Sequence, residues 1–584
     1  MLALDKPFTY ELSADLRAGV GSYVRFRFHG KLTRGWVLGP TDDIPTRILP
    51  VTRLVSPVRF FDAALLALAA AVAERYVTPL ATVLGAMAPP RVAGEETPAA
   101  IAPAQQRTRE GSPDGEGPLG DYRRGRELLA AIGGPGPRRW ALRPAPEDEA
   151  AIALTLVAAS LRRGRGALVL VPEAEPVPAT ATAIAAAFGS RVAMFLGGAP
   201  RERYRTWLRI SRGETDVVVG TRAAVFSQIP VPLGVIVVTR ESHPAFRDDR
   251  APYYHAREVA SLRAGLDTSA PVCVAMASCP SAETAAADLP TAEPAGRRWP
   301  TVEVVRPGAE GRAPRLLQAM REARRAFVFA PNPGYGIAQI CRTCGAPAAC
   351  ASCGGMLRSE EGEVRCVVCE AQGRCAVCGG ATFGIRRGGA ERVQEWLARI
   401  AAVPVVRPDR PRLPDPGGEV LVGGPELVRD LGVGDLDLVA IMDADRAASR
   451  PGLGARERAL AVWMEVAGWA RPSGRVIVQS EHPSDPAVQA LVRGNAARFH
   501  ERERERRDAA GFPVGDAVFR VVGGDGLEEA VRGLRPRTVL TTSLGGRTVC
   551  LLALDPERVP AFGRAMRALA ASGLVERVEA DPHI

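Results

Sequence analysis

Short apolar runs that alternate with helical segments dominate the centre of the chain. Residues 167–171 and 235–238 contain no polar side chain, which is typical of strands buried on both faces of a sheet. Between such runs lie segments with apolar residues at intervals of three and four, which predict helices at 150–162 and 179–188. Strands that alternate with helices predict a parallel α/β sheet, and we place a first lobe of this kind at 137–290.

A second block of the same pattern follows later in the chain. Its expected strands are 326–330, 419–422, 438–442 and 476–479. We therefore predict a second α/β lobe in two parts, 291–340 and 379–500, with the residues between them inserted into it.

The N-terminal part, 1–90, is rich in expected strands and includes a basic hairpin. Apolar and basic residues alternate over 24–28, so one face of this strand can pack while the other presents arginine. The candidate DNA-binding residues of the hairpin are Arg25, Arg27, Lys31 and Arg34. An ordinary solvated strand face is the alternative interpretation of the same pattern.

Two further regions complete the division into domains. Residues 91–136 are rich in glycine, proline, alanine and glutamate with little apolar periodicity, which predicts a flexible linker. The last part, 501–584, combines an expected helix at 559–571 with short strands and predicts a small α+β domain. Those strands are expected at 517–522, 549–554 and 575–580.

Composition narrows the class of partner. The 584 residues carry 75 lysines and arginines against 65 acids, a formal net charge of +10, which suits a polyanion such as DNA. Only Lys6 and Lys31 are lysines, so arginine supplies nearly all the positive charge. We find no secretory signal, and no apolar run reaches the roughly 18 residues of a membrane span. We therefore expect a cytoplasmic monomer without membrane contact.

Eight of the 11 cysteines lie within 341–378, in four CxxC pairs separated by five, twelve and five residues. Each CxxC offers two thiolates to one metal, and two such pairs complete a tetrahedral zinc site. This pattern predicts a module with two zinc ions per chain. All four positions on each ion are filled by protein, so the zinc is structural. The alternative, a disulfide framework, requires an oxidising compartment.

The eight cysteines can be paired in two main ways. Neighbouring CxxC pairs could share an ion across five residues, which is cramped. We favour nesting, because its inner spacing is close to the usual CxxC…CxxC separation. The nested ligand sets are Cys341, Cys344, Cys375 and Cys378 for the first zinc, and Cys350, Cys353, Cys366 and Cys369 for the second.

Two α/β lobes, a cysteine array inserted in the second, a basic β-rich N-terminus and a small end domain together resemble the PriA family of replication-restart helicases, also called primosomal protein N′. The resemblance is weakest over 91–136, where the family usually carries a winged-helix domain. Local segments that are similar to the family are 171–173, 220–226, 254–260, 278–283, 443–445 and 466–471.

The resemblance implies two RecA-like helicase lobes, a two-zinc module with nested ligation and an N-terminal DNA-binding domain. It also implies a function in replication restart: recognition of forked or single-stranded DNA, assembly with primosome proteins and loading of the replicative helicase.

The residues that hold ATP in this family are missing here. Neither lysine of the chain precedes serine or threonine, so there is no Walker A motif. Counting back from the family-like segment 171–173, the lysine and threonine positions that the resemblance implies fall on Glu149 and Ala150. Glu241 is the one acid left at the Walker B position, and two positions of motif VI are Trp469 and Pro472.

We therefore predict no catalytic residue and a helicase fold kept without ATP turnover. Two alternatives remain open at this point. One is an active ATP-dependent DNA helicase with a non-standard nucleotide site. The other is a scaffold that binds only proteins.

Overall fold

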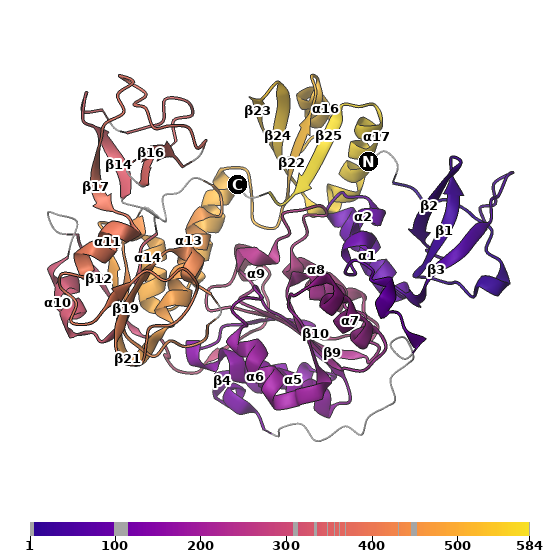
Figure 1. Ribbon diagram of the computed structural model, residues 1–584, viewed down its shortest axis with the longest axis horizontal. Helices are drawn as coiled ribbons and strands as arrows, with labels where there is room; N and C mark the ends of the chain where they lie inside the picture. Colours follow the sequence, from indigo (N-terminus) through magenta and orange to yellow (C-terminus); the bar gives the residue numbers. More distant parts are fainter. Residues whose placement is uncertain are drawn as a thin grey trace.

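The computed structural model describes residues 5–98, 115–307, 313–331, 336–346, 348–355, 357–360, 363–367, 369–429, 431–445 and 452–582. Over these ranges the chain forms five sheets (Figure 1). The expected multidomain α/β architecture is confirmed, with two helicase-like lobes, a cysteine-rich insertion in the second and smaller domains at both ends. Within the same ranges, no helix has both the length and the apolar content that a membrane span requires.

Lobe 1 is built on an eight-stranded sheet in the order β4-β11-β5-β10-β9-β6-β8-β7. The apolar strands β6 and β9 pair in parallel near its centre, where helices cover both faces. The strands are β4 (Tyr122–Arg123), β5 (Arg139–Leu142), β6 (Gly166–Leu170), β7 (Val192–Phe195), β8 (Val217–Gly220), β9 (Leu233–Thr239), β10 (Val272–Met276) and β11 (Thr291–Pro294). The helices are α4 (Gly125–Ala131), α5 (Glu149–Arg162), α6 (Ala179–Phe188), α7 (Pro200–Ser211), α8 (Ala256–Leu266) and α9 (Ala282–Ala286).

Lobe 2 repeats this plan with a six-stranded parallel sheet in the order β12-β21-β20-β13-β19-β18. Its strands are β12 (Thr301–Val305), β13 (Arg325–Phe329), β18 (Val405–Val406), β19 (Glu419–Gly423), β20 (Leu436–Ile441) and β21 (Ala470–Gln479). Its helices are α10 (Pro314–Glu322), α11 (Ala390–Leu397), α13 (Ala455–Ala467), α14 (Pro486–Arg493) and α15 (Ala497–Ala509).

Three smaller sheets complete the molecule, each antiparallel. The N-terminal sheet has the order β2-β1-β3, with β1 (Ser22–Phe28), β2 (Lys31–Trp36) and β3 (Val51–Arg59), followed by α1 (Ala63–Arg75) and α2 (Leu80–Ala86). The cysteine-rich sheet has the order β16-β15-β14-β17, with β14 (Gly336–Cys341), β15 (Leu357–Glu360), β16 (Glu363–Cys366) and β17 (Phe383–Gly388). The C-terminal sheet has the order β23-β24-β22-β25, with β22 (Ala517–Gly523), β23 (Thr538–Leu544), β24 (Arg547–Leu554) and β25 (Val575–Ala580), plus α16 (Leu527–Gly533) and α17 (Val559–Ala571).

The flexible linker expected at 91–136 is folded over much of its length. Its second half forms a 3₁₀ helix (Gly117–Asp121), β4 and α4. Leu119, Tyr122 and Leu128 from this stretch are buried in the apolar cluster that includes α5. These elements are too short to produce a visible apolar periodicity, so composition alone misled the prediction. Residues 99–114 lie outside the described residues.

One apolar core joins the N-terminal helices, lobe 1 and the C-terminal domain. Phe60 stacks on Trp207 of α7, with their ring centroids 5.3 Å apart. Ion pairs reinforce the contact: Arg75 at the end of α1 pairs with Asp581 at 3.1 Å, and Arg247 of lobe 1 pairs with Glu579 at 2.7 Å. These three parts are therefore packed as one body.

Candidate functional sites

The eight CxxC cysteines come together as two groups of four. In each group the Sγ atoms all lie within 4.8 Å of one another. The first group comprises Cys341, Cys344, Cys375 and Cys378, and the second comprises Cys350, Cys353, Cys366 and Cys369. This is the nested arrangement.

The sulfur–sulfur distances fit thiolates around a metal. Cys341 and Cys378 are 3.6 Å apart, and Cys353 and Cys366 are 3.4 Å apart. A disulfide bond measures about 2.05 Å, so these sulfurs are not bonded to each other. A regular tetrahedron with metal–sulfur bonds of about 2.3 Å has sulfurs roughly 3.8 Å apart. Both groups are therefore close to the size that a four-thiolate zinc site requires.

All four CxxC segments form the same turn. In each, the residue after the second cysteine donates its N–H to the carbonyl of the first, over 2.8 to 3.1 Å. That residue has a positive φ, between 58° and 73°, a region that favours glycine. Three of these positions are Gly345, Gly354 and Gly379, but the fourth is Glu370.

Backbone amides point at the sulfurs in these turns. The N–H of Ser352 donates to Cys350 Sγ at 3.4 Å, and the N–H of Val377 donates to Cys375 Sγ at the same distance. The Ser352 and Cys353 amides lower the pKa of Cys350 to about 6, because they stabilise its thiolate. Backbone amides likewise lower the pKa of Cys375, so these turns favour the thiolate form of the first cysteine of each of these two pairs.

A row of three arginines crosses the N-terminal sheet. Arg25 on β1 lies opposite Arg34 on β2 and opposite Arg53 on β3. Directly opposed residues share one face of a sheet, and like charges in that position are destabilising. None of the three forms an ion pair with a described residue, and Arg25 Nε is buried without a hydrogen-bond partner. We call Arg34, Arg25 and Arg53 the arginine row; its uncompensated charge favours an anion.

The other two candidate DNA-binding residues lie apart from the row. Arg27 lies two residues beyond Arg25 on the same face and donates to the carbonyl of Gly30 at 3.2 Å. Lys31 is opposite Phe28, so it belongs to the other face. That face is aromatic: the ring centroids of Phe8 and Phe28 are 4.8 Å apart, and those of Tyr10 and Phe26 are 4.6 Å apart.

The start of α5, where the family's phosphate-binding residues are expected, is acidic. Asp148 is buried and accepts hydrogen bonds from Tyr122 Oη at 2.9 Å and from Arg298 at 2.6 Å. Glu147 accepts from Arg298 at 2.8 Å. The N–H groups at a helix N-terminus attract negative charge, and here the chain supplies that charge itself.

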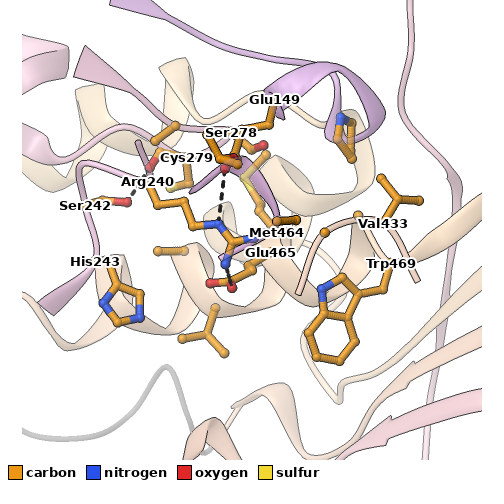
Figure 2. A pocket seen from close by; sticks show the side chains of 18 of the residues that line it. Glu149, Arg240, Ser242, His243, Ser278, Cys279, Val433, Met464, Glu465 and Trp469 are labelled. Carbon is orange, nitrogen blue, oxygen red and sulfur yellow. Dashed lines mark hydrogen bonds and ion pairs between the residues drawn. The ribbon is translucent and has the colours of Figure 1, made fainter. Parts of the chain in front are cut away.

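A cavity of about 310 Å³ separates this helix start from lobe 2, and we call it the inter-lobe cleft. Figure 2 shows Arg240 between Glu149 of α5 and Glu465 of α13. Arg240 Nε is 3.6 Å from Glu149, and Arg240 Nη1 pairs directly with Glu465. The wall of lobe 2 also includes Trp469, which is buried and packs edge-on against Phe327.

Glu241, the acid left at the Walker B position, has a structural role. It is fully buried, pairs with Arg257 of α8 at 3.0 Å, and accepts the N–H of Ser281 at 2.6 Å. Ser281 in turn caps α9. The carboxylate is thus occupied by neighbouring groups of lobe 1.

Comparison with known proteins identifies the family. Residues 1–89 match the family model described as the PriA 3′DNA-binding domain. A probable replication restart protein PriA of Mycobacterium bovis is 31% identical over 625 residues, which covers 97% of this chain and 92% of the relative. The chain belongs to the PriA family of replication restart proteins.

PriA proteins of two more distant bacteria also match. That of Treponema pallidum is 28% identical over 57% of this chain and 56% of its own, and that of Bacillus subtilis is 26% identical over 56% and 46%. Among solved structures, the helicase MrfA bound to DNA is 13% identical with a TM-score of 0.34, over 71% of this chain and 58% of that chain.

Several site residues of this PriA-family protein were missed from the sequence. Arg53 was not predicted, because only the register of β3 brings it beside Arg25. Glu465 and Arg298 were not predicted, because they lie far along the chain from their partners. Glu465 pairs with Arg240, and Arg298 pairs with Asp148. The one local signal was the acidic run at 147–149, which requires nearby cations once it is partly buried.

The repeated turn generates a prediction about Glu370. Replacing Glu370 with glycine relieves a left-handed backbone that costs about 1 kcal/mol for a residue with a Cβ. We expect Glu370→Gly to retain metal at higher chelator concentration than the unsubstituted protein. The matched change Gly379→Ala introduces the same strain, so this variant should lose half of its metal at a lower chelator concentration than the unsubstituted protein. Equal midpoints for both variants would show that the backbone conformation is unimportant.

Proposed function

We propose that this PriA-family protein recognises forked or single-stranded DNA and promotes loading of the replicative helicase without hydrolysing ATP. It acts in the cytoplasm as a monomer, together with primosome proteins. The match of its N-terminal residues to a 3′DNA-binding domain and its restart-protein relatives support the DNA and restart parts of this proposal.

The acidic start of α5 is the observation that supports the absence of ATP hydrolysis in this proposal. Nucleotide sites use the first turn of a helix to bind phosphate through free N–H groups and a lysine. Here Glu147, Asp148 and Glu149 surround that turn, and Arg298 and Arg240 pair with them. A triphosphate would meet three carboxylates and would have to displace these ion pairs.

The DNA contacts proposed are the arginine row together with Arg27, with Lys31 on the aromatic face. Arginine forms bidentate hydrogen bonds to phosphate, and an anion relieves the repulsion within the row. The aromatic rings of the opposite face, Phe8 among them, can stack on unpaired bases. Together these two faces suit a DNA end with both paired and unpaired parts.

The metal proposed for both cysteine groups is zinc, two ions per chain. Four thiolates in a tetrahedron are typical of structural zinc. The apolar cluster of this module contains four cysteines beside Leu357 and Phe383, so the fold of the module depends on the metal.

The ATPase test decides between the proposal and its alternative. With saturating forked DNA, we expect the zinc-loaded protein to release phosphate from ATP no faster than DNA alone, and to separate no strands. A gel shift in the same buffer verifies that the protein is folded and bound. Turnover that rises in proportion to protein would instead establish an active helicase with a non-standard nucleotide site.

The arginine row predicts a change in salt dependence. A triple variant in which alanine replaces Arg25, Arg34 and Arg53 should bind forked DNA at least about tenfold more weakly. The slope of the logarithm of its binding constant against the logarithm of the salt concentration should be smaller by roughly three, one for each lost phosphate contact. Fluorescence anisotropy at several salt concentrations measures both. Arg532→Ala is the matched control, since this exposed arginine pairs with Glu528 in α16. An unchanged slope in the triple variant would remove the row from the interface.

The metal assignment predicts a stoichiometry. Elemental analysis of the purified protein should give two zinc ions per chain, and Cys350→Ser should reduce this to about one. Cys273→Ser, a change at a buried cysteine in β10, should leave two. A different metal, or an unchanged count in Cys350→Ser, would contradict the assignment.

A further inference from the structure

The two ends of the molecule are attached to different lobes. Figure 1 shows the N-terminal sheet and the cysteine-rich sheet at opposite ends of the long axis. The N-terminal helices share their core with lobe 1, whereas the cysteine-rich sheet joins lobe 2 through β13 and α11. The angle between the lobes therefore sets the distance between the two ends.

Charged residues join the lobes across the inter-lobe cleft. Arg240 follows β9 of lobe 1 and pairs with Glu465 of lobe 2 while it also contacts Glu149 (Figure 2). All three side chains are partly buried, with 14 to 16% of their surface exposed. A second pair, between Glu173 of lobe 1 and Arg429 of lobe 2, lies nearby.

The backbone of Arg240 is held in an uncommon conformation. Its φ is 47°, in the left-handed region that a residue with a Cβ seldom adopts. Such a conformation persists only where the surrounding packing determines it. The packing thus directs this side chain from lobe 1 toward α13.

Two glycines bring the lobes into direct contact beside the ion pairs. A Cβ on Gly468 at the end of α13 would lie 3.0 Å from the Cβ of Pro146 in lobe 1. A Cβ on Gly432 would lie 3.1 Å from that of Ala179 in α6. Both distances are shorter than ordinary van der Waals contact, so a larger residue at either position would push against the other lobe.

From these contacts we propose that Arg240 is a positioning residue that holds the two lobes closed in the absence of nucleotide. Its ion pair with Glu465 fixes the spacing between the arginine row and the cysteine-rich module, which on this proposal is a second contact with the same forked DNA. The role of lobe closure in DNA binding rests on the proposed function. Lobe closure itself does not depend on that function.

Closure has a direct physical cause. An arginine removed from water requires compensating carboxylates, and Arg240 obtains one from each lobe. Opening the cleft separates it from Glu465, and it also exposes Trp469 and the apolar wall around it. Both effects favour the closed arrangement.

The experiment uses the full-length, zinc-loaded protein. Arg240→Ala removes the cation, and Arg240→Lys keeps the charge. Gly468→Val enlarges a residue at the lobe contact without changing any charge. The matched controls are Arg222→Ala, whose partner Asp248 is in the same lobe, and Gly265→Val, at a helical glycine with open space around it. Small-angle X-ray scattering reports the lobe arrangement, and anisotropy reports affinity for forked DNA and for a short single-stranded oligonucleotide.

Arg240→Ala and Gly468→Val should each increase the radius of gyration and weaken fork binding by about tenfold, because two linked contacts no longer act together. Binding of the short oligonucleotide should be unchanged. General unfolding would instead weaken the binding of both DNAs. Arg240→Lys and both controls should behave as the unsubstituted protein. Unchanged scattering in Arg240→Ala and Gly468→Val would overturn the proposal. Loss of fork binding by the unsubstituted protein would refute the DNA function alone, since scattering still tests closure.

Discussion

A partly buried arginine between two carboxylates is the contact on which the arrangement of the two lobes depends. Removing a charge from water costs several kcal/mol unless an opposite charge is close, and Arg240 finds its partners in Glu149 and Glu465. Because the carboxylates belong to different lobes, satisfying one charge also orients two domains. The contact lies in the inter-lobe cleft, between the start of α5 and α13, and so joins the two lobes there.

The cysteine-rich module also brings together chemical groups from separate parts of the chain, here two groups of four cysteines. It has few apolar residues of its own, and its buried positions are mainly sulfur ligands. With a metal bound, order there would come from charge neutralisation at the thiolates rather than from removal of apolar surface from water. Each of the four repeated turns holds one pair of cysteines together, and the nested topology brings two such pairs to one site.

Much of this fold can be predicted from the sequence, because its central strands are unbroken apolar runs. The strand expected at 235–238 is β9, and the helix expected at 150–162 is α5. The cysteine spacing favours the nested pairing, which the structure has. Prediction fails where a structural role depends on distant residues. The short elements at 117–131 carry too few apolar positions to show a period, and Arg53 joins the arginine row only through strand register. Glu465 meets Arg240 from 225 positions away, and no local pattern encodes such a contact.

Arginine, not lysine, supplies nearly all the positive charge of this chain, and this affects how the protein responds to chemical modification. The two lysines of the chain are both in the N-terminal domain: Lys6 lies over the ring of Phe8, and Lys31 begins β2. Acetylation neutralises lysine amines but leaves guanidinium groups charged. The attraction of this protein for a polyanion is therefore almost insensitive to lysine acylation. Reagents that react with side-chain amines will mark only these two positions, beside the aromatic face, and thus give a selective handle for attaching a probe.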